Sequence, residues 1–226
     1  MLPRLSLIAL LGAAAALTGP PARAAGNAEI VDDAFIGAPG ECQVETWVTR
    51  LSRRSGAATV SPACTLRALP ALQLGALTST SWQPGPEDTT IGPIAKVALG
   101  SVGALGFAVD GEADWSIDTG RLETASVIVP VSLTLSEAVT LSLNAGWLWR
   151  RDGGHNAAFY GAQVEWHAAD RWTLVAEFFG DSRSDPGLQT GVRWTPRPWL
   201  DLEALAGYKV DGEADLGLTL GVTVRF

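Results

Sequence analysis

Charged residues recur at every second position within several otherwise apolar or small-residue stretches of the sequence. If these stretches are β-strands, the charged side chains all point to one face. In a closed barrel that face lines the lumen, where rings of charge bias which solutes pass along a water-filled path. The same residues could instead pair with one another and fill a narrow interior. The candidate lumen-lining residues are Lys96, Arg150, Glu165, Glu177, Arg193, Asp201, Glu203 and Lys209.

Four of these residues fall on four successive candidate strands. Glu165, Glu177 and Glu203 supply carboxylates, and Arg193 supplies a guanidinium. They predict a belt of acids crossed by one arginine. Such a belt is either a selectivity ring in an open lumen or a salt-bridged network, because buried charges are tolerated when they are paired and hydrogen-bonded.

Catalytic patterns are weak in this sequence. Of the two histidines, His155 lies in a glycine-rich stretch and His167 near an expected strand end, and neither has a serine at an evident spacing for nucleophile activation. We find no phosphate-binding glycine motif and no metal-ligand cluster. We therefore expect no catalytic residue, no metal and no cofactor. The acids in expected loops indicate a solvated surface: Asp181, Asp185, Asp211, Glu213 and Asp215.

The first 24 residues have the pattern of a removable signal peptide. Arg4 precedes an uncharged apolar run at 5–17, and the small-x-small site at 22–24 follows. The apolar run is short for a membrane-spanning helix, which needs about 20 residues, although an N-terminal anchor is the alternative. Removing Arg4 and Arg23 takes the net charge from −8 to −10. This acidity argues against nucleic acid as a partner, since phosphate binding needs a basic face.

The clearest strand pattern is at the C-terminus. From 216 to 226 every even position is apolar, and the odd positions are glycine, threonine or arginine. Alternation over about ten residues fits a strand between lipid and a polar lumen, whereas strands of soluble sandwiches are usually shorter. The pattern recurs in six further segments and, less regularly, in five more: 127–135, 141–150, 158–167, 171–178, 188–195 and 200–209, then 41–51, 57–69, 71–79, 90–99 and 102–110.

These twelve segments predict an all-β protein, an antiparallel transmembrane β-barrel over residues 41–226. Short links alternate with longer polar ones, such as 110–121, as in barrels with short periplasmic turns and longer outer loops. Pro93 and Pro130 interrupt expected strands and mark either bulges or misplaced boundaries. An N-terminal periplasmic segment at 25–40 precedes the barrel, as a tail or as a partial plug in the lumen.

Large aromatic residues lie near the ends of the expected strands. This arrangement is typical of the two interfacial girdles of membrane barrels, whereas a soluble core would not sort aromatic residues by strand end. The expected girdle residues are Trp147, Trp149, Trp166, Trp172, Trp194, Trp199 and Phe226.

Cys42 and Cys64 are the two cysteines of the sequence. An even pair in an exported chain indicates a disulfide, and two thiols without nearby histidines leave zinc short of ligands. The two cysteines lie at neighbouring ends of the first expected hairpin. A bridge is therefore feasible if their Cα atoms lie within about 7 Å.

Short motifs spread along the chain carry a family resemblance: Glu41–Trp47, Ser61–Cys64, Leu72–Gly75, Gly146–Trp149, Arg151–Gly153 and Val175–Asp181. Together with the C-terminal Phe226, they resemble a group of uncharacterised, porin-like proteobacterial outer-membrane β-barrels. The resemblance implies the fold and the location and supplies no activity.

We therefore expect a barrel in the bacterial outer membrane that is a narrow passive channel for small solutes. The expected partners are outer-membrane lipid, the barrel-assembly machinery through the C-terminal strand, and a small solute. Three alternatives stay open: a plugged barrel with a structural or surface-binding role, a soluble periplasmic ligand-binding barrel, and an outer-membrane enzyme.

Overall fold

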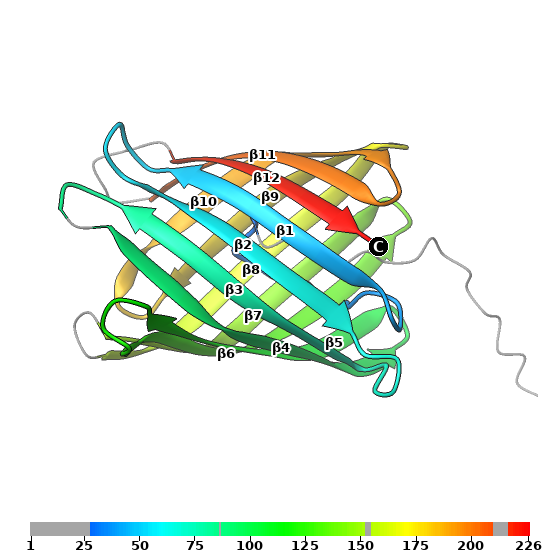
Figure 1. The fold of residues 1–226 in the computed structure, drawn as a ribbon. Helices are drawn as coiled ribbons and strands as arrows, with labels where there is room; N and C mark the ends of the chain where they lie inside the picture. The colour runs from blue at the N-terminus through cyan, green and yellow to red at the C-terminus, as the bar shows by residue number, and fades with distance from the viewer. Residues whose placement is uncertain (1–27, 86, 152–154, 210–216) are drawn as a thin grey trace, which may run out of the picture.

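The computed structural model describes residues 28–85, 87–151, 155–209 and 217–226. Within them, twelve antiparallel strands close into one barrel, in which each strand pairs with its sequence neighbours and β12 pairs with β1 (Figure 1). The expected all-β barrel of twelve strands is thus confirmed, and the expected signal peptide lies outside the described residues. The strands are β1 Cys42–Arg50, β2 Gly56–Thr65, β3 Leu72–Trp82, β4 Asp88–Val102, β5 Leu105–Ser116, β6 Leu122–Ser136, β7 Val139–Arg150, β8 His155–Ala169, β9 Trp172–Asp181, β10 Ser184–Arg197, β11 Leu200–Lys209 and β12 Gly217–Arg225.

The barrel is polar inside and apolar outside. Among the described residues, buried polar and charged residues outnumber buried apolar ones, 25 to 10. On β12, Thr219 and Thr223 are buried, whereas Leu218, Leu220 and Val222 are exposed. A protein folded in water shows the reverse distribution, because burying apolar surface drives its folding. The exterior therefore suits an apolar surrounding. No helix in the described part of the chain has the length and apolar character needed to cross a membrane.

The two ends of the barrel differ. The short links between β2 and β3, β4 and β5, β6 and β7, β8 and β9, and β10 and β11 lie at one end, here named the turn end. The C-terminus lies at this end as well (Figure 1). The opposite end, where β1 ends and β2 begins, is named the loop end.

Two expected loops are largely strand. The loop predicted to hold Asp181 and Asp185 is formed by the ends of β9 and β10, and Asp181 is buried where a solvated acid was expected.

The second case is the loop predicted over 110–121. Here β5 continues to Ser116 and pairs with both neighbours. The error came from the acids Asp110, Glu112 and Asp114, whose density is typical of a loop. They occupy alternate positions, however, and so share the inner face of one strand.

The two prolines singled out from the sequence, Pro93 and Pro130, lie where β5 loses pairing to its neighbours. Pairing between β4 and β5 is interrupted at Gly92 and Pro93, and pairing between β5 and β6 is interrupted at Val129 and Pro130, in both cases without a change of register. The register shift between β4 and β5 comes later in β4, between Ala98 and Gly100. The prolines thus interrupt one ladder each and do not form bulges, because proline lacks the N–H that the ladder needs.

The predicted disulfide between Cys42 and Cys64 is confirmed. The two residues face each other in the register of β1 and β2, with their Cα atoms 4.0 Å apart and an S–S distance of 2.05 Å. The bridge therefore ties the first hairpin together at the turn end of the barrel.

The expected girdle residues lie on the outer surface near the strand ends. Trp172 and Trp194 stack with a centroid distance of 5.6 Å at the turn end. Near the loop end, Trp147 donates from Nε1 to Asn156 Oδ1 at 3.0 Å. Other expected girdle residues are exposed at the turn end (Trp166, Trp199 and Phe226) or half-buried near the loop end (Trp149).

Candidate functional site: the barrel lumen

A short N-terminal stretch, residues 28–35, lies against the inner wall of the barrel and is named the inner segment. Val31 is fully buried, and its N–H donates to Glu177 Oε1 at 2.9 Å. Asn144 on β7 accepts the N–H of Asp32 at 2.9 Å and donates to its carbonyl at 2.7 Å. Of the two positions that the sequence left open for this stretch, the structure shows the one inside the barrel.

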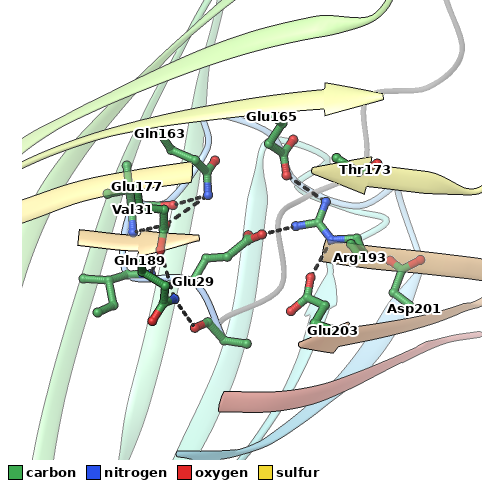
Figure 2. Close-up of polar contacts among 12 residues, drawn as sticks. Glu29, Val31, Gln163, Glu165, Thr173, Glu177, Gln189, Arg193, Asp201 and Glu203 are labelled. Carbon is green, nitrogen blue, oxygen red and sulfur yellow. Dashed lines mark hydrogen bonds and ion pairs between the residues drawn. The ribbon is translucent and has the colours of Figure 1, made fainter. Parts of the chain in front are cut away.

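Glu177 on β9 anchors the middle of the inner segment (Figure 2). Its carboxylate accepts the N–H groups of Ile30 and Val31, at 3.3 and 2.9 Å. It also accepts the side-chain amides of Gln163 and Gln189, each at 3.1 Å. Four donors thus surround a buried carboxylate, which compensates for its lost hydration. This residue holds the segment and does not belong to the arginine network.

Arg193 on β10 is the centre of a charged cluster, the arginine cluster (Figure 2). Its guanidinium donates through Nη2 to Glu29 at 2.6 Å, through Nη1 to Glu165 at 2.7 Å, and through Nε to Glu203 at 2.5 Å. All four residues are buried. The structure thus brings together three of the four belt residues predicted from the sequence. The inner segment adds the carboxylate of Glu29, which the sequence did not identify.

Three carboxylates surround this single guanidinium, so the cluster holds more negative than positive charge. Burial raises the pKa of the Glu29 carboxyl, Arg193 opposes this effect, and Glu203 and Glu165 add to it. Glu29 therefore takes up a proton more readily here than it would in water.

Lys96 on β4 connects the inner segment to the opposite side of the lumen. Its Nζ lies 2.8 Å from Asp32 and 3.4 Å from Asp33. Burial raises the pKa of the Asp32 carboxyl, and Lys96 opposes this effect. Asp110 lies directly opposite Lys96 in the register of β4 and β5.

The other residues predicted to line the lumen lie toward the ends of the barrel. Asp201 is buried and pairs with Arg225 at 2.7 Å. Arg150 pairs with Asp181 at 2.9 Å near the loop end, and its side chain is 50% exposed. These residues are thus apart from the arginine cluster. The side chain of Lys209 lies outside the part of the chain that the structure describes.

A cavity of about 430 Å³ lies between the inner segment and the inner faces of β1 to β6. Glu29 and Asp32 of the inner segment line one side, and Asp110, Glu112 and Asp114 of β5 line another. The three β5 acids were missed as lumen residues because they were assigned to a loop. Their spacing of two residues was the signal that could have placed them on a strand face.

The structure places His167 at the turn end. Its Nδ1 lies 2.9 Å from Thr173 Oγ1. The side chain of His155 lies outside the part of the chain that the structure describes. In the described ranges, no group of three or more His, Cys, Asp or Glu side chains is arranged to hold a metal ion.

Solved structures with a similar fold are outer-membrane barrels. The KdgM porin matches with a TM-score of 0.66 and 6% identity, over 81% of this chain and 99% of its own. An outer-membrane channel from Pseudomonas putida F1 matches with a TM-score of 0.64 and 10% identity, over 86% and 98%. An active-site variant of outer-membrane phospholipase A from Escherichia coli matches with a TM-score of 0.53 and 11% identity, over 84% and 91%. At such identities the likeness shows a common barrel fold.

The sequence comparisons give a family without an activity. No curated protein matches the sequence. A family model described as "Uncharacterised conserved protein UCP029691" matches residues 13–226, which is nearly the whole chain. The resemblance to an uncharacterised, porin-like barrel family is therefore confirmed at this level, and the chain belongs to the uncharacterised conserved protein family UCP029691.

Proposed function

We propose that the protein spans the bacterial outer membrane and lets small solutes pass passively through a narrow lumen beside the inner segment. The observation that carries this proposal is the closed barrel with an apolar exterior and a polar, partly hollow interior. Closed barrels satisfy every backbone hydrogen bond between strands, which lipid requires. The similarity to an outer-membrane porin and an outer-membrane channel supports the same location and role.

The inner segment limits the size of the solute. It lies against one wall of the lumen and leaves a cavity of about 430 Å³ beside the other. This is near the small end of the range for ligand sites, about 300–1,000 Å³. The lumen therefore suits small solutes. The KdgM porin has been solved in complex with oligogalacturonate, which supports solute entry into a barrel of this fold.

The orientation that we propose places the turn end in the periplasm. Short turns face the periplasm in bacterial barrels, and the Cys42–Cys64 bridge needs an oxidising compartment when it forms. The aromatic residues would then lie at the two lipid interfaces. We also propose that the barrel-assembly machinery of a proteobacterium recognises the last strand, which ends in Phe226.

A plugged barrel with a structural or surface-binding role is the second candidate. The observation that favours it is the firm hold on the inner segment by Glu177, Asn144 and the arginine cluster. We propose no catalytic role; the side chain of His167 hydrogen-bonds to Thr173. The likeness to a phospholipase makes phospholipid hydrolysis the activity to assay for this alternative.

Single-channel conductance in a planar bilayer tests the channel, with a refolded batch that shows heat-shifted gel mobility. Discrete current steps are expected from an open path. A folded and inserted barrel that carries no current would contradict the channel and favour the plugged barrel.

A further inference from the structure

The open part of the lumen has an unbalanced charge. Five carboxylates line the cavity: Glu29, Asp32, Asp110, Glu112 and Asp114. The cation that lines it is Lys96, which pairs with the aspartates of the inner segment. The unbalanced charge therefore lies mainly on β5.

Glu112 and Asp114 are the two β5 acids farthest from Lys96. Within the described ranges, neither forms an ion pair with a lysine or arginine within 4.0 Å. Asp114 accepts a hydrogen bond from Thr124 Oγ1 at 3.0 Å through its Oδ2 atom. Both acids lie on the cavity wall, so a solute in the cavity can reach this side of β5.

Within the described residues, one oxygen of the Asp114 carboxylate has no hydrogen-bond partner. This atom is Oδ1, and the residue is 5% exposed. A buried carboxylate oxygen without a partner is costly. Because Asp114 lines the cavity, a cation bound there would supply the missing partner.

The same cavity has apolar walls, which are unusual in the lumen of a membrane barrel. Trp47, Leu77, Ile94 and Ile128 line it from the barrel wall, and Ile30 lines it from the inner segment. An inorganic cation would keep its water and gain nothing from these side chains. An ammonium ion with organic substituents would bury apolar surface against them and could lie over the face of the Trp47 ring.

We propose that this cavity binds small organic cations, namely substituted ammonium ions, and that it makes the lumen selective for them. The carboxylates of Glu112 and Asp114 neutralise the ammonium group, and the isoleucine and tryptophan side chains contact its substituents. The selectivity part of this inference rests on the proposed channel. Binding of the cation in the cavity does not require that the barrel conducts.

The test uses the full-length barrel and benzyltrimethylammonium as the probe, with benzenesulfonate as an anion of similar size. Calorimetry in detergent measures binding, and reversal potentials in a planar bilayer measure relative permeability. We expect the cation to bind and to permeate in preference to the anion. The variant Glu112→Gln with Asp114→Asn should bind the cation about tenfold more weakly, as expected for the loss of charged hydrogen-bond partners.

A matched control is Glu137→Gln with Asp170→Asn, which removes two exposed acids at the turn end. It should leave cation binding unchanged. Heat-shifted gel mobility establishes that each variant is folded. The preference for the cation over the anion is measured on the unmodified barrel and does not depend on any variant.

Each outcome separates the cavity from the channel. Cation binding by a barrel that carries no current would support the cation cavity and contradict the channel. Conduction without cation preference or binding would overturn the cation cavity and leave the channel intact. Absence of both would contradict both proposals. Equal cation binding by the unmodified and the β5 variant barrels would overturn the assignment to Glu112 and Asp114.

Discussion

The two sides of the lumen are built in different ways. On the inner faces of β6 to β10, side chains such as Asn144, Glu177 and Arg193 hold the inner segment by hydrogen bonds and ion pairs. On the inner faces of β1 to β6, polar and apolar side chains face a cavity, so β6 borders both sides. We refer to them as the occupied side and the open side.

The difference shows two uses of charge in one barrel. On the occupied side the carboxylates contact a guanidinium or several N–H donors, and these contacts hold the segment in place. On the open side Glu112 and Asp114 have no such cationic partner in the described chain. Charges that the protein itself satisfies favour a closed interior, whereas charges left facing a cavity favour a solute.

The largest effect is expected from Arg193→Gln on the occupied side. This change leaves three buried carboxylates without their cation, and breaking a buried ion pair costs about 3–5 kcal/mol. We expect a comparable loss in the free energy of unfolding, measured by urea titration in lipid vesicles, together with protease access to the inner segment. Arg197→Gln removes an exposed arginine from the same strand and serves as the control. Similar losses in both variants would show that the cluster does not hold the segment.

The next effect concerns the open side, where a covalent link joins β1 and β2. Replacing Cys42 and Cys64 by serine removes a bridge between residues 22 positions apart. We expect the free energy of unfolding to fall by about 3 kcal/mol, because the unfolded chain loses a constraint. Conductance should stay unchanged, since the bridge lies at the end of the hairpin. A changed conductance would indicate that the bridge shapes the lumen itself.

A smaller effect is expected from crowding the inner segment with one methyl group. A Cβ atom on Gly161 would lie 2.6 Å from Val31 Cγ2, so Gly161→Ala must push the segment away from β8. Overpacking of this kind costs about 1–3 kcal/mol. We expect the conductance to fall, measured in planar bilayers, because the segment moves away from β8 toward the cavity and narrows it.

Gly111→Ala is the matched control for this change, because its Cβ would meet nothing nearer than Ser126 O at 3.9 Å. If Gly161→Ala left the conductance as unchanged as Gly111→Ala does, the inner segment would not restrict the path.

The barrel could be predicted from the sequence because apolar and polar residues alternate along each strand, and the apolar positions mark the face that contacts lipid. The regular β12 and the presence of twelve strands follow from it, and so does the meeting of Arg193 with Glu165 and Glu203. The inner segment could not be placed in this way. Its residues show no strand period, and its partners are far away in sequence, as in the bond from Val31 to Glu177, 146 residues apart. The cavity is bounded by the inner segment, so it could not be predicted from the sequence either.

The smallest effect is a dependence of the inner segment on pH. Glu29 faces Arg193 together with Glu203, Glu165 and Glu177, and burial raises the pKa of the Glu29 carboxyl when the segment is docked. A released segment would restore the ordinary pKa, so the docked state holds more protons at pH values between the two. Lower pH therefore favours docking, and a rise in pH through this window weakens it.

We expect protease access to the inner segment to increase with pH, and the conductance with it. Glu29→Gln carries a permanent hydrogen in place of the titrating carboxyl, so this variant should stay docked and lose most of the dependence. The Asp32 carboxyl, whose pKa burial also raises, accounts for the remainder. Glu137→Gln, at an exposed position of the turn end, should keep the full dependence. If Glu29→Gln retained the full pH dependence, the main titrating group would be a residue other than Glu29. The occupied side would then differ from the open side only through the arginine cluster and the hydrogen bonds of Glu177, and not through a dependence on pH.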